Sequence, residues 1–142
     1  MRSLLGAAIE EEADVTLVDM EAGLEHLSRS GGTLAYADVL LMVMEPSRKS
    51  ILTAGRTIAL ARELGIPLVY GVGNKARLPD DEEFFRSVCA EYDVPLAGIV
   101  PENEDVAEAD RSGQILGEGQ GDPVKEAVRN IVDFVDEALV ST

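Results

Sequence analysis

One stretch decides the fold: Val15-Thr-Leu-Val-Asp-Met-Glu-Ala-Gly-Leu-Glu-His26. Its short apolar run ends in Asp19 and is followed by Gly23, a pattern typical of a buried strand that delivers a carboxylate to its C-terminal end. Sheets of the α/β class bind their ligands at that edge, and a carboxylate there can hold Mg²⁺ through water. We therefore expect a buried strand over residues 14–19, with Asp19 at a ligand-binding edge.

Strands and helices alternate along the rest of the chain. Short, continuous apolar runs predict further strands over 39–44, 66–72 and 94–100. Apolar residues at helical spacing predict helices over 3–12, 47–64, 80–92, 103–111 and 122–139. The glycine-rich stretches predict loops over 23–36 and 113–121. This alternation indicates a single α/β domain, residues 1–142, with a doubly wound, mostly parallel sheet and helices on both faces.

Composition excludes several classes of protein. A chain of 142 residues that is 46% hydrophobic is long enough for one domain with a real core. Its 27 acidic and 12 basic residues give a formal charge of −15, which opposes binding to nucleic acid and to anionic membranes. An acid-rich source proteome would produce the same charge. The single Cys89 rules out an intrachain disulfide framework, and no apolar run approaches the roughly 18–20 residues of a membrane span. We expect a soluble, cytoplasmic protein.

A phosphate-binding loop is missing from this pattern. A nucleotide site at such a sheet edge normally needs a glycine-rich turn and a lysine to cradle the phosphates. The sequence has only three lysines, Lys49, Lys75 and Lys125, and none of them follows a glycine. The glycine-rich stretch 113–121 contains no lysine. Because no strand is expected before residues 14–19, we expect the sheet to lack an N-terminal phosphate-loop strand.

Four motifs carry a family resemblance: Asp19-Met-Glu-Ala-Gly-Leu-Glu-His26, Glu45-Pro-Ser47, Ser50 to Ala54, and Asn74-Lys75. Together they resemble the C-terminal half of the deviant-Walker ATPases, the MinD/ParA-like family of P-loop NTPases that includes the nitrogenase iron protein. Within that family they look most like the ATPases that insert nickel into carbon monoxide dehydrogenase. The resemblance runs from about Leu4 to Phe134.

The resemblance implies a role for particular residues. Asp19 would be the Walker B carboxylate on the Mg²⁺ side, and Gly23 would belong to the catalytic switch whose amide senses the γ-phosphate of ATP. Asn74 would hydrogen-bond the adenine edge, with Lys75 beside it. The loop Pro101-Glu102-Asn103 would flank the base from the other side. The family's phosphate loop and its Cys-x-Cys metal pair have no counterpart here, so we do not expect this chain alone to hydrolyse ATP.

Structural interpretations compete with these roles. A carboxylate such as Asp19 at a strand end also serves as a helix cap or turn residue, and Asn74-Lys75 is a common turn composition. His26 is the only histidine, so it cannot build a metal site with other histidines of the same subunit, and we expect it to be a structural or switch-region residue. Cys89 lies on the inner face of its helix, where a thiol behaves as a small apolar group.

Two functional hypotheses follow. The first is the C-terminal part of a nickel-insertion ATPase that uses ATP and Mg²⁺, acts as a homodimer or with a separate N-terminal half, and serves a client metalloenzyme. The second is a nucleotide-free interaction or scaffold module that keeps the fold without catalysis. A truncated chain, a misassigned start codon and a separate polypeptide with the N-terminal half are three explanations for the missing loop. Without the family's first strand, residues 15–18 must pair with 39–43 or the chain must self-associate, and we expect self-association.

Overall fold

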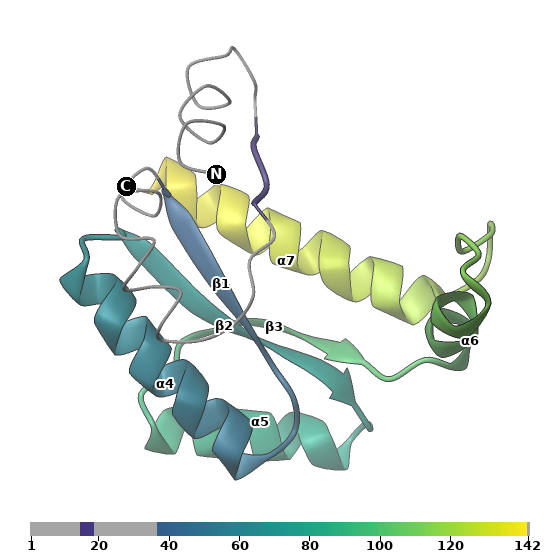
Figure 1. Ribbon diagram of the computed structural model, residues 1–142, viewed down its shortest axis with the longest axis horizontal. Helices are drawn as coiled ribbons and strands as arrows, with labels where there is room; N and C mark the ends of the chain where they lie inside the picture. The colour runs from purple at the N-terminus through teal and green to yellow at the C-terminus, as the bar shows by residue number, and fades with distance from the viewer. Residues whose placement is uncertain (1–14, 19–36, 142) are drawn as a thin grey trace.

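The computed structural model describes residues 15–18 and 37–141. Its described residues form a parallel sheet in the order β1-β2-β3, made of β1 (Val39–Met44), β2 (Leu68–Ala76) and β3 (Leu96–Pro101). The helices are α4 (Arg48–Glu63), α5 (Asp80–Glu91), α6 (Glu104–Ser112) and α7 (Asp122–Val140). Helices α4 and α5 cover one face of the sheet and α7 covers the other (Figure 1). The expected α/β fold, with a parallel sheet and helices on both faces, is confirmed.

Local capping signals explain where α4 begins and ends. Ser47 lies just before the helix, and its hydroxyl oxygen accepts a hydrogen bond from the Ser50 amide at 3.1 Å. This bond satisfies one of the amides that have no partner inside the first turn. Gly65 follows the C-terminal end with a φ of +90°, a conformation that glycine adopts without a steric penalty. The sequence prediction of a helix over 47–64 is therefore confirmed, with Ser47 as its cap.

The prediction of a strand over residues 14–19 is wrong for the residues of that range that the structure describes. Residues 15–18 form no strand there, and the side chains of Val15 and Leu17 are 73% and 92% exposed. The alternative to self-association, an internal pairing of 15–18 with 39–43, is likewise not formed among the described residues. An apolar run becomes a buried strand only where a neighbouring strand accepts its hydrogen bonds, and that condition is non-local. The predicted helix 3–12 and loop 23–36, as well as Asp19, Gly23 and His26, lie outside the described residues.

Strand β2 is longer than its sequence pattern indicates. It runs from Leu68 to Ala76, whereas the apolar run predicted a strand over 66–72. The glycines of β2 are needed for packing, because a Cβ on Gly71 would lie 2.7 Å from Met44 Cε and one on Gly73 would lie 2.9 Å from the Phe85 ring. Asn74 and Lys75 therefore belong to the last residues of β2 and not to a turn after it.

The end of β2 contains an irregularity in its pairing with β3. Gly73 is opposite Ile99 and Ala76 is opposite Pro101, so Asn74 and Lys75 together occupy the space opposite one β3 residue. Lys75 has a backbone φ of +55°, a value that residues other than glycine rarely adopt. Bulges of this kind bend a strand and turn its side chains in new directions.

Two apolar clusters hold the layers together. The larger cluster lies between the sheet and helices α4 and α5, and its fully buried side chains include Met44, Ile51, Ile58, Phe85 and Val88. The smaller cluster joins α7 to the other face of the sheet through Val72, Val100 and Ile131. Beside it, the rings of Tyr70 and Phe134 meet edge to face with centroids 4.9 Å apart, an arrangement that aromatic pairs favour.

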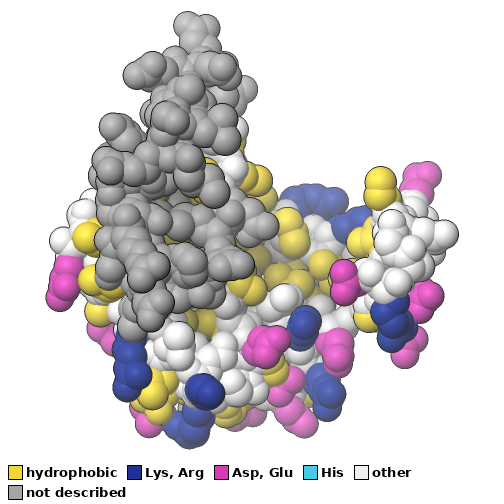
Figure 2. Space-filling view, in the orientation of Figure 1, with side chains coloured by type: hydrophobic (Ala, Val, Ile, Leu, Met, Phe, Trp, Pro, Cys, Tyr) yellow, Lys and Arg dark blue, Asp and Glu magenta, His cyan; other side chains and the backbone are white. Residues whose placement is uncertain are grey.

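One side of β1 is left uncovered in the described part of the structure. Met42 and Met44 are buried against α4, whereas Leu41 and Val43, which point the other way, are 38% and 62% exposed. Helix α7 packs mainly on β3, at the far edge of the sheet. Figure 2 shows hydrophobic side chains in the hollow beside α7. None of the described helices is long and apolar enough to cross a membrane.

Candidate functional site

The three parallel strands end at the same edge of the sheet, and a charged residue directly follows each of them. Glu45 follows β1, Arg77 follows β2 and Glu102 follows β3. These residues line a polar cleft of about 340 Å³, together with Pro46, Lys75 and Asp81. We call this the strand-end cleft. Its place fits the rule that α/β sheets bind ligands outside the carboxyl ends of their strands.

Ion pairs connect the strand ends across the cleft. The Arg77 Nε donates to Glu102 Oε2 at 3.1 Å, and Lys75 Nζ lies 3.7 Å from Glu45 Oε1. All four side chains are at least half exposed, so water screens both pairs and each contributes little to stability. Asp81 adds a third carboxylate to the lining, which gives the cleft a formal charge of one negative. A cleft of this sign is better suited to a neutral base or sugar than to phosphates.

Backbone hydrogen bonds fix the residues around the cleft. The Glu45 amide donates to Ser50 Oγ at 2.9 Å, which ties the end of β1 to the first turn of α4. The Glu102 amide donates to the Ala76 carbonyl at 2.8 Å, which joins the ends of β2 and β3. The cleft therefore has a hydrogen-bonded backbone rim that carries exposed side chains.

Arg77 and Asp81 are bonded to each other in both directions. The Arg77 amide donates to the Asp81 carboxylate at 2.7 Å, and the Asp81 amide donates to the Arg77 carbonyl at 2.9 Å. This arrangement provides partners for amides near the start of α5, a helix whose N-cap residue, Pro79, makes no side-chain cap bond. It fixes the backbone of Arg77 relative to the helix.

The structure brings together some of the site residues expected from the sequence. Lys75 and Glu102 line the strand-end cleft, whereas Asn74 and Pro101 belong to the last residues of β2 and β3 and are not among its lining residues. Asp19 and Gly23, expected on the Mg²⁺ and γ-phosphate side, lie outside the described residues.

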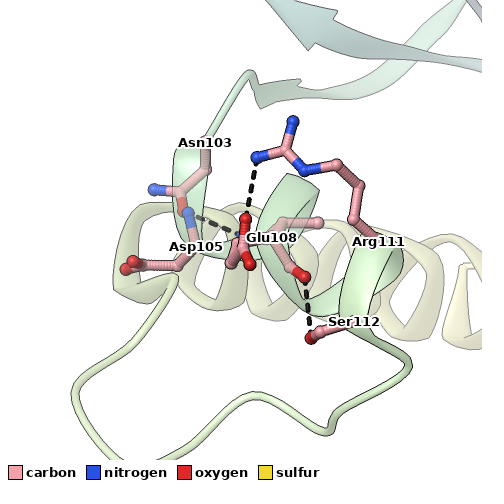
Figure 3. A network of polar contacts seen from close by, with 6 residues as sticks. Asn103, Asp105, Glu108, Arg111 and Ser112 are labelled. Atoms are coloured by element: carbon pink, nitrogen blue, oxygen red, sulfur yellow. Dashed lines mark hydrogen bonds and ion pairs between the residues drawn. The ribbon is translucent and has the colours of Figure 1, made fainter.

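The expected flanking loop is partly used for capping. The side-chain oxygen of Asn103 accepts hydrogen bonds from the Asp105 and Val106 amides at 2.9 and 3.3 Å, which caps α6 (Figure 3). The same helix carries an exposed ion pair between Glu108 and Arg111 at 2.9 Å. Asn103 therefore has a structural task, and of this loop only Glu102 lines the cleft.

Sequence reasoning missed Arg77 and Asp81 as site residues. The predicted strand ended at residue 72 and the next predicted helix began at residue 80, so Arg77 fell between them with no assigned role. With the observed end at Ala76, Arg77 becomes the first residue after the strand, in the same position as Glu45 and Glu102. The usable signal was therefore a charged residue after each apolar strand, provided that the strand end is placed correctly.

The described residues offer no obvious metal centre. Within 15–18 and 37–141, no group of three or more His, Cys, Asp or Glu side chains is arranged to hold a metal ion. Cys89 is buried against the larger apolar cluster, and burial raises the pKa of its thiol. This thiol is therefore a packing group, as the sequence indicated.

Comparison with known proteins identifies relatives of the chain. No family model matches it. It is 35% identical over 113 residues to the carbon monoxide dehydrogenase accessory protein CooC of Rhodospirillum rubrum, a match that covers 80% of this chain and 41% of that protein. It is 36% identical over 114 residues to an uncharacterized ATP-binding protein of Methanocaldococcus jannaschii, covering 80% of this chain and 44% of that protein.

Solved structures with the same fold include two MinD proteins. The cell division ATPase MinD of Pyrococcus furiosus superposes with a TM-score of 0.72 at 18% identity and covers 96% of this chain and 58% of its own. MinD of Aquifex aeolicus superposes with a TM-score of 0.59 at 18% identity, covering 78% and 48%. The chain thus spans less than half the length of the curated relatives, which fits the expectation that it corresponds to their C-terminal half. Over that span it is homologous to CooC and the MinD-like ATP-binding proteins and shares the fold of the MinD ATPases.

Proposed function

We propose that this chain is the C-terminal part of a MinD/ParA-like ATPase that takes part in nickel insertion into carbon monoxide dehydrogenase. The observation that carries the proposal is the strand-end cleft, formed by the residues that follow three parallel strands in a chain related to ATP-binding proteins. The nickel step rests on the similarity to CooC, a carbon monoxide dehydrogenase accessory protein.

The adenine side of the ATP site is assigned to the ends of β2 and β3. Asn74 and Lys75 lie in the bulge at the end of β2, and Pro101 and Glu102 lie at the end of β3. An amide side chain such as that of Asn74 can donate to and accept from one adenine edge. The negative charge of the cleft favours the neutral base over the phosphates at this position.

The Mg²⁺ and γ-phosphate side is assigned to the motif that begins at Asp19. Asp19 orients the water shell of Mg²⁺, and the Gly23 region changes position when the γ-phosphate leaves, as switch segments do in nucleotide hydrolases. The lysine and the amides that cradle the phosphates come from outside these 142 residues, because none of the three lysines follows a glycine. The client is a nickel metalloenzyme.

Calorimetric titration of the 142-residue chain with adenosine and with ATP tests the nucleotide proposal. We expect weak binding of adenosine and no tighter binding of ATP, because much of the binding energy of ATP lies in its phosphates. A matched pair of variants, Asn74→Ala in the bulge at the end of β2 and Asn130→Ala on the exposed side of α7, should separate a specific effect on binding from a general one. Binding of ATP with a Kd below about 1 μM would show that a phosphate site lies within this chain.

The nickel proposal needs a cellular test. We expect that deletion of the gene from its source organism lowers the nickel content of carbon monoxide dehydrogenase, and that excess nickel in the medium partly restores it. Asp19→Asn should behave like the deletion, whereas Asp133→Asn, an exposed change on α7, should behave like the wild type. An unchanged nickel content after deletion would contradict the nickel role.

A second candidate function is that of a nucleotide-free interaction module, and it is favoured by the outer edge of β1, which pairs with no other strand among residues 15–18 and 37–141. Val39–Met44 contains no charged residue and no proline, although these are the usual means by which an edge strand avoids pairing with other chains. Leu41 and Val43 add exposed apolar surface beside that edge. We propose self-association through β1, and light scattering at high micromolar concentration tests it. A clean monomer would rule out the homodimer, and a lack of adenosine binding by a dimer would favour this second function.

A further inference from the structure

Arg77 occupies a particular position in the strand-end cleft. Its backbone is held from both sides by Asp81, through bonds of 2.7 and 2.9 Å. Its side chain reaches toward the end of β3, where Nε donates to Glu102 Oε2 at 3.1 Å, and the side chain remains 81% exposed. The residue therefore combines a fixed backbone with a guanidinium group that one ion pair orients and that faces solvent.

The lining of the cleft contains few surfaces on which a flat ligand can stack. The described residues that line it are Glu45, Pro46, Lys75, Arg77, Asp81 and Glu102, and none of them is aromatic. The Lys75 ammonium is a compact, strongly hydrated point charge, whereas the Arg77 guanidinium is a weakly hydrated plane that stacks on aromatic rings. Arg77 is therefore the cationic plane available to a base in this cleft.

We propose that Arg77 is the base-stacking residue of the strand-end cleft, and that the face of its guanidinium lies against the purine ring. This inference rests on the proposed nucleotide-binding function and extends it to a residue outside the expected site. Glu102 sets the orientation of the plane by holding Nε, and Asp81 holds the backbone from which the side chain extends. The ligand class is a neutral purine nucleoside, because the cleft carries more carboxylates than cations.

The experiment compares adenosine binding by the wild-type chain and three variants in calorimetric titrations. Arg77→Ala removes the plane, and Arg77→Lys keeps the positive charge without the plane. Arg111→Ala is the matched control, because it removes an exposed Arg–Glu pair of similar length, 2.9 Å against 3.1 Å, on α6. We expect Arg77→Ala to lose roughly fivefold to tenfold in affinity, the size of a cation–π contact of about 1 kcal/mol or slightly more. Arg77→Lys should lose most of that factor, because an ammonium has no plane on which the base can stack. Arg111→Ala should bind as the wild type does.

Each outcome bears on a different claim. Adenosine binding by Arg77→Ala at wild-type strength would overturn the stacking role and leave the proposed function standing. Wild-type binding by Arg77→Lys would show that charge and not the plane matters, which also overturns stacking. A wild-type chain that does not bind adenosine would overturn the nucleotide site itself. Circular dichroism melting of each variant checks that the fold is retained, as expected for exposed side chains.

Discussion

Substitution of Gly73 by alanine should destabilise the protein by overpacking its core. A Cβ at this position would lie 2.9 Å from two atoms of the Phe85 ring and 3.0 Å from a third. Phe85 is fully buried at 0% exposure and packs in the cluster that joins α5 to the sheet, so the ring cannot swing into solvent. Extra methyl groups forced into a well-packed core typically cost about 1–3 kcal/mol, and we expect Gly73→Ala to fall in this range.

Urea unfolding followed by circular dichroism measures the loss in the free energy of unfolding. Two further variants serve as a control and as a compensating substitution. Gly117→Ala is the control, because its new Cβ would meet only the end of the flexible Gln120 side chain at 3.2 Å. Phe85→Leu should make room, so Gly73→Ala should cost less in that background than in the wild type, and the double-mutant cycle should give a coupling above about 0.5 kcal/mol. A Gly73→Ala protein within about 0.5 kcal/mol of the wild type would refute the packing of Phe85 against β2.

Three other outcomes are expected. The purified chain should release phosphate from ATP no faster than background, because lysine and amide groups that neutralise the transferred phosphoryl group are missing from the sequence; turnover abolished by Asp19→Asn would contradict this. Val43→Lys should shift the chain toward monomer in light scattering, since a lysine on an edge strand opposes pairing with another chain, and an unchanged mass would exclude β1 as the interface. Lys75→Gly should be more stable to urea than Lys75→Ala by about 1 kcal/mol, because residue 75 has a φ of +55°; equal stabilities would argue against the bulge.

Local signals explain what the sequence could predict about the fold. The uninterrupted apolar run of β1 and the Ser47 cap of α4 are complete within a few residues, and both elements lie where they were expected. The end of β2 was missed because the apolar run stops at Val72, whereas the strand continues through Gly73, which has no side chain and leaves room for Phe85. This contact depends on a side chain from another element, so the sequence around β2 alone does not reveal it.

The same limit applies to the site. Lys75 and Glu102 could be proposed from the family resemblance, and both line the strand-end cleft. Arg77 could not, because its position depends on where β2 ends. Residues 15–18 were misjudged for a related reason, since a strand needs a neighbour and the sequence of the strand alone does not provide one.

The two cations of the strand-end cleft lie at the end of β2, Lys75 within the strand and Arg77 directly after it, and each pairs with an acidic residue that follows a neighbouring strand. The end of the middle strand is therefore joined by one ion pair to the residue after β1 and by another to the residue after β3. Because exposed ion pairs of this kind contribute only about 0–1 kcal/mol to stability, either pair can break without disturbing the packed layers beneath it. A ligand in the cleft can thus replace the ion pair on one side of β2 while the pair on the other side stays formed. The rim of the cleft can therefore adapt to a ligand on one side at a time.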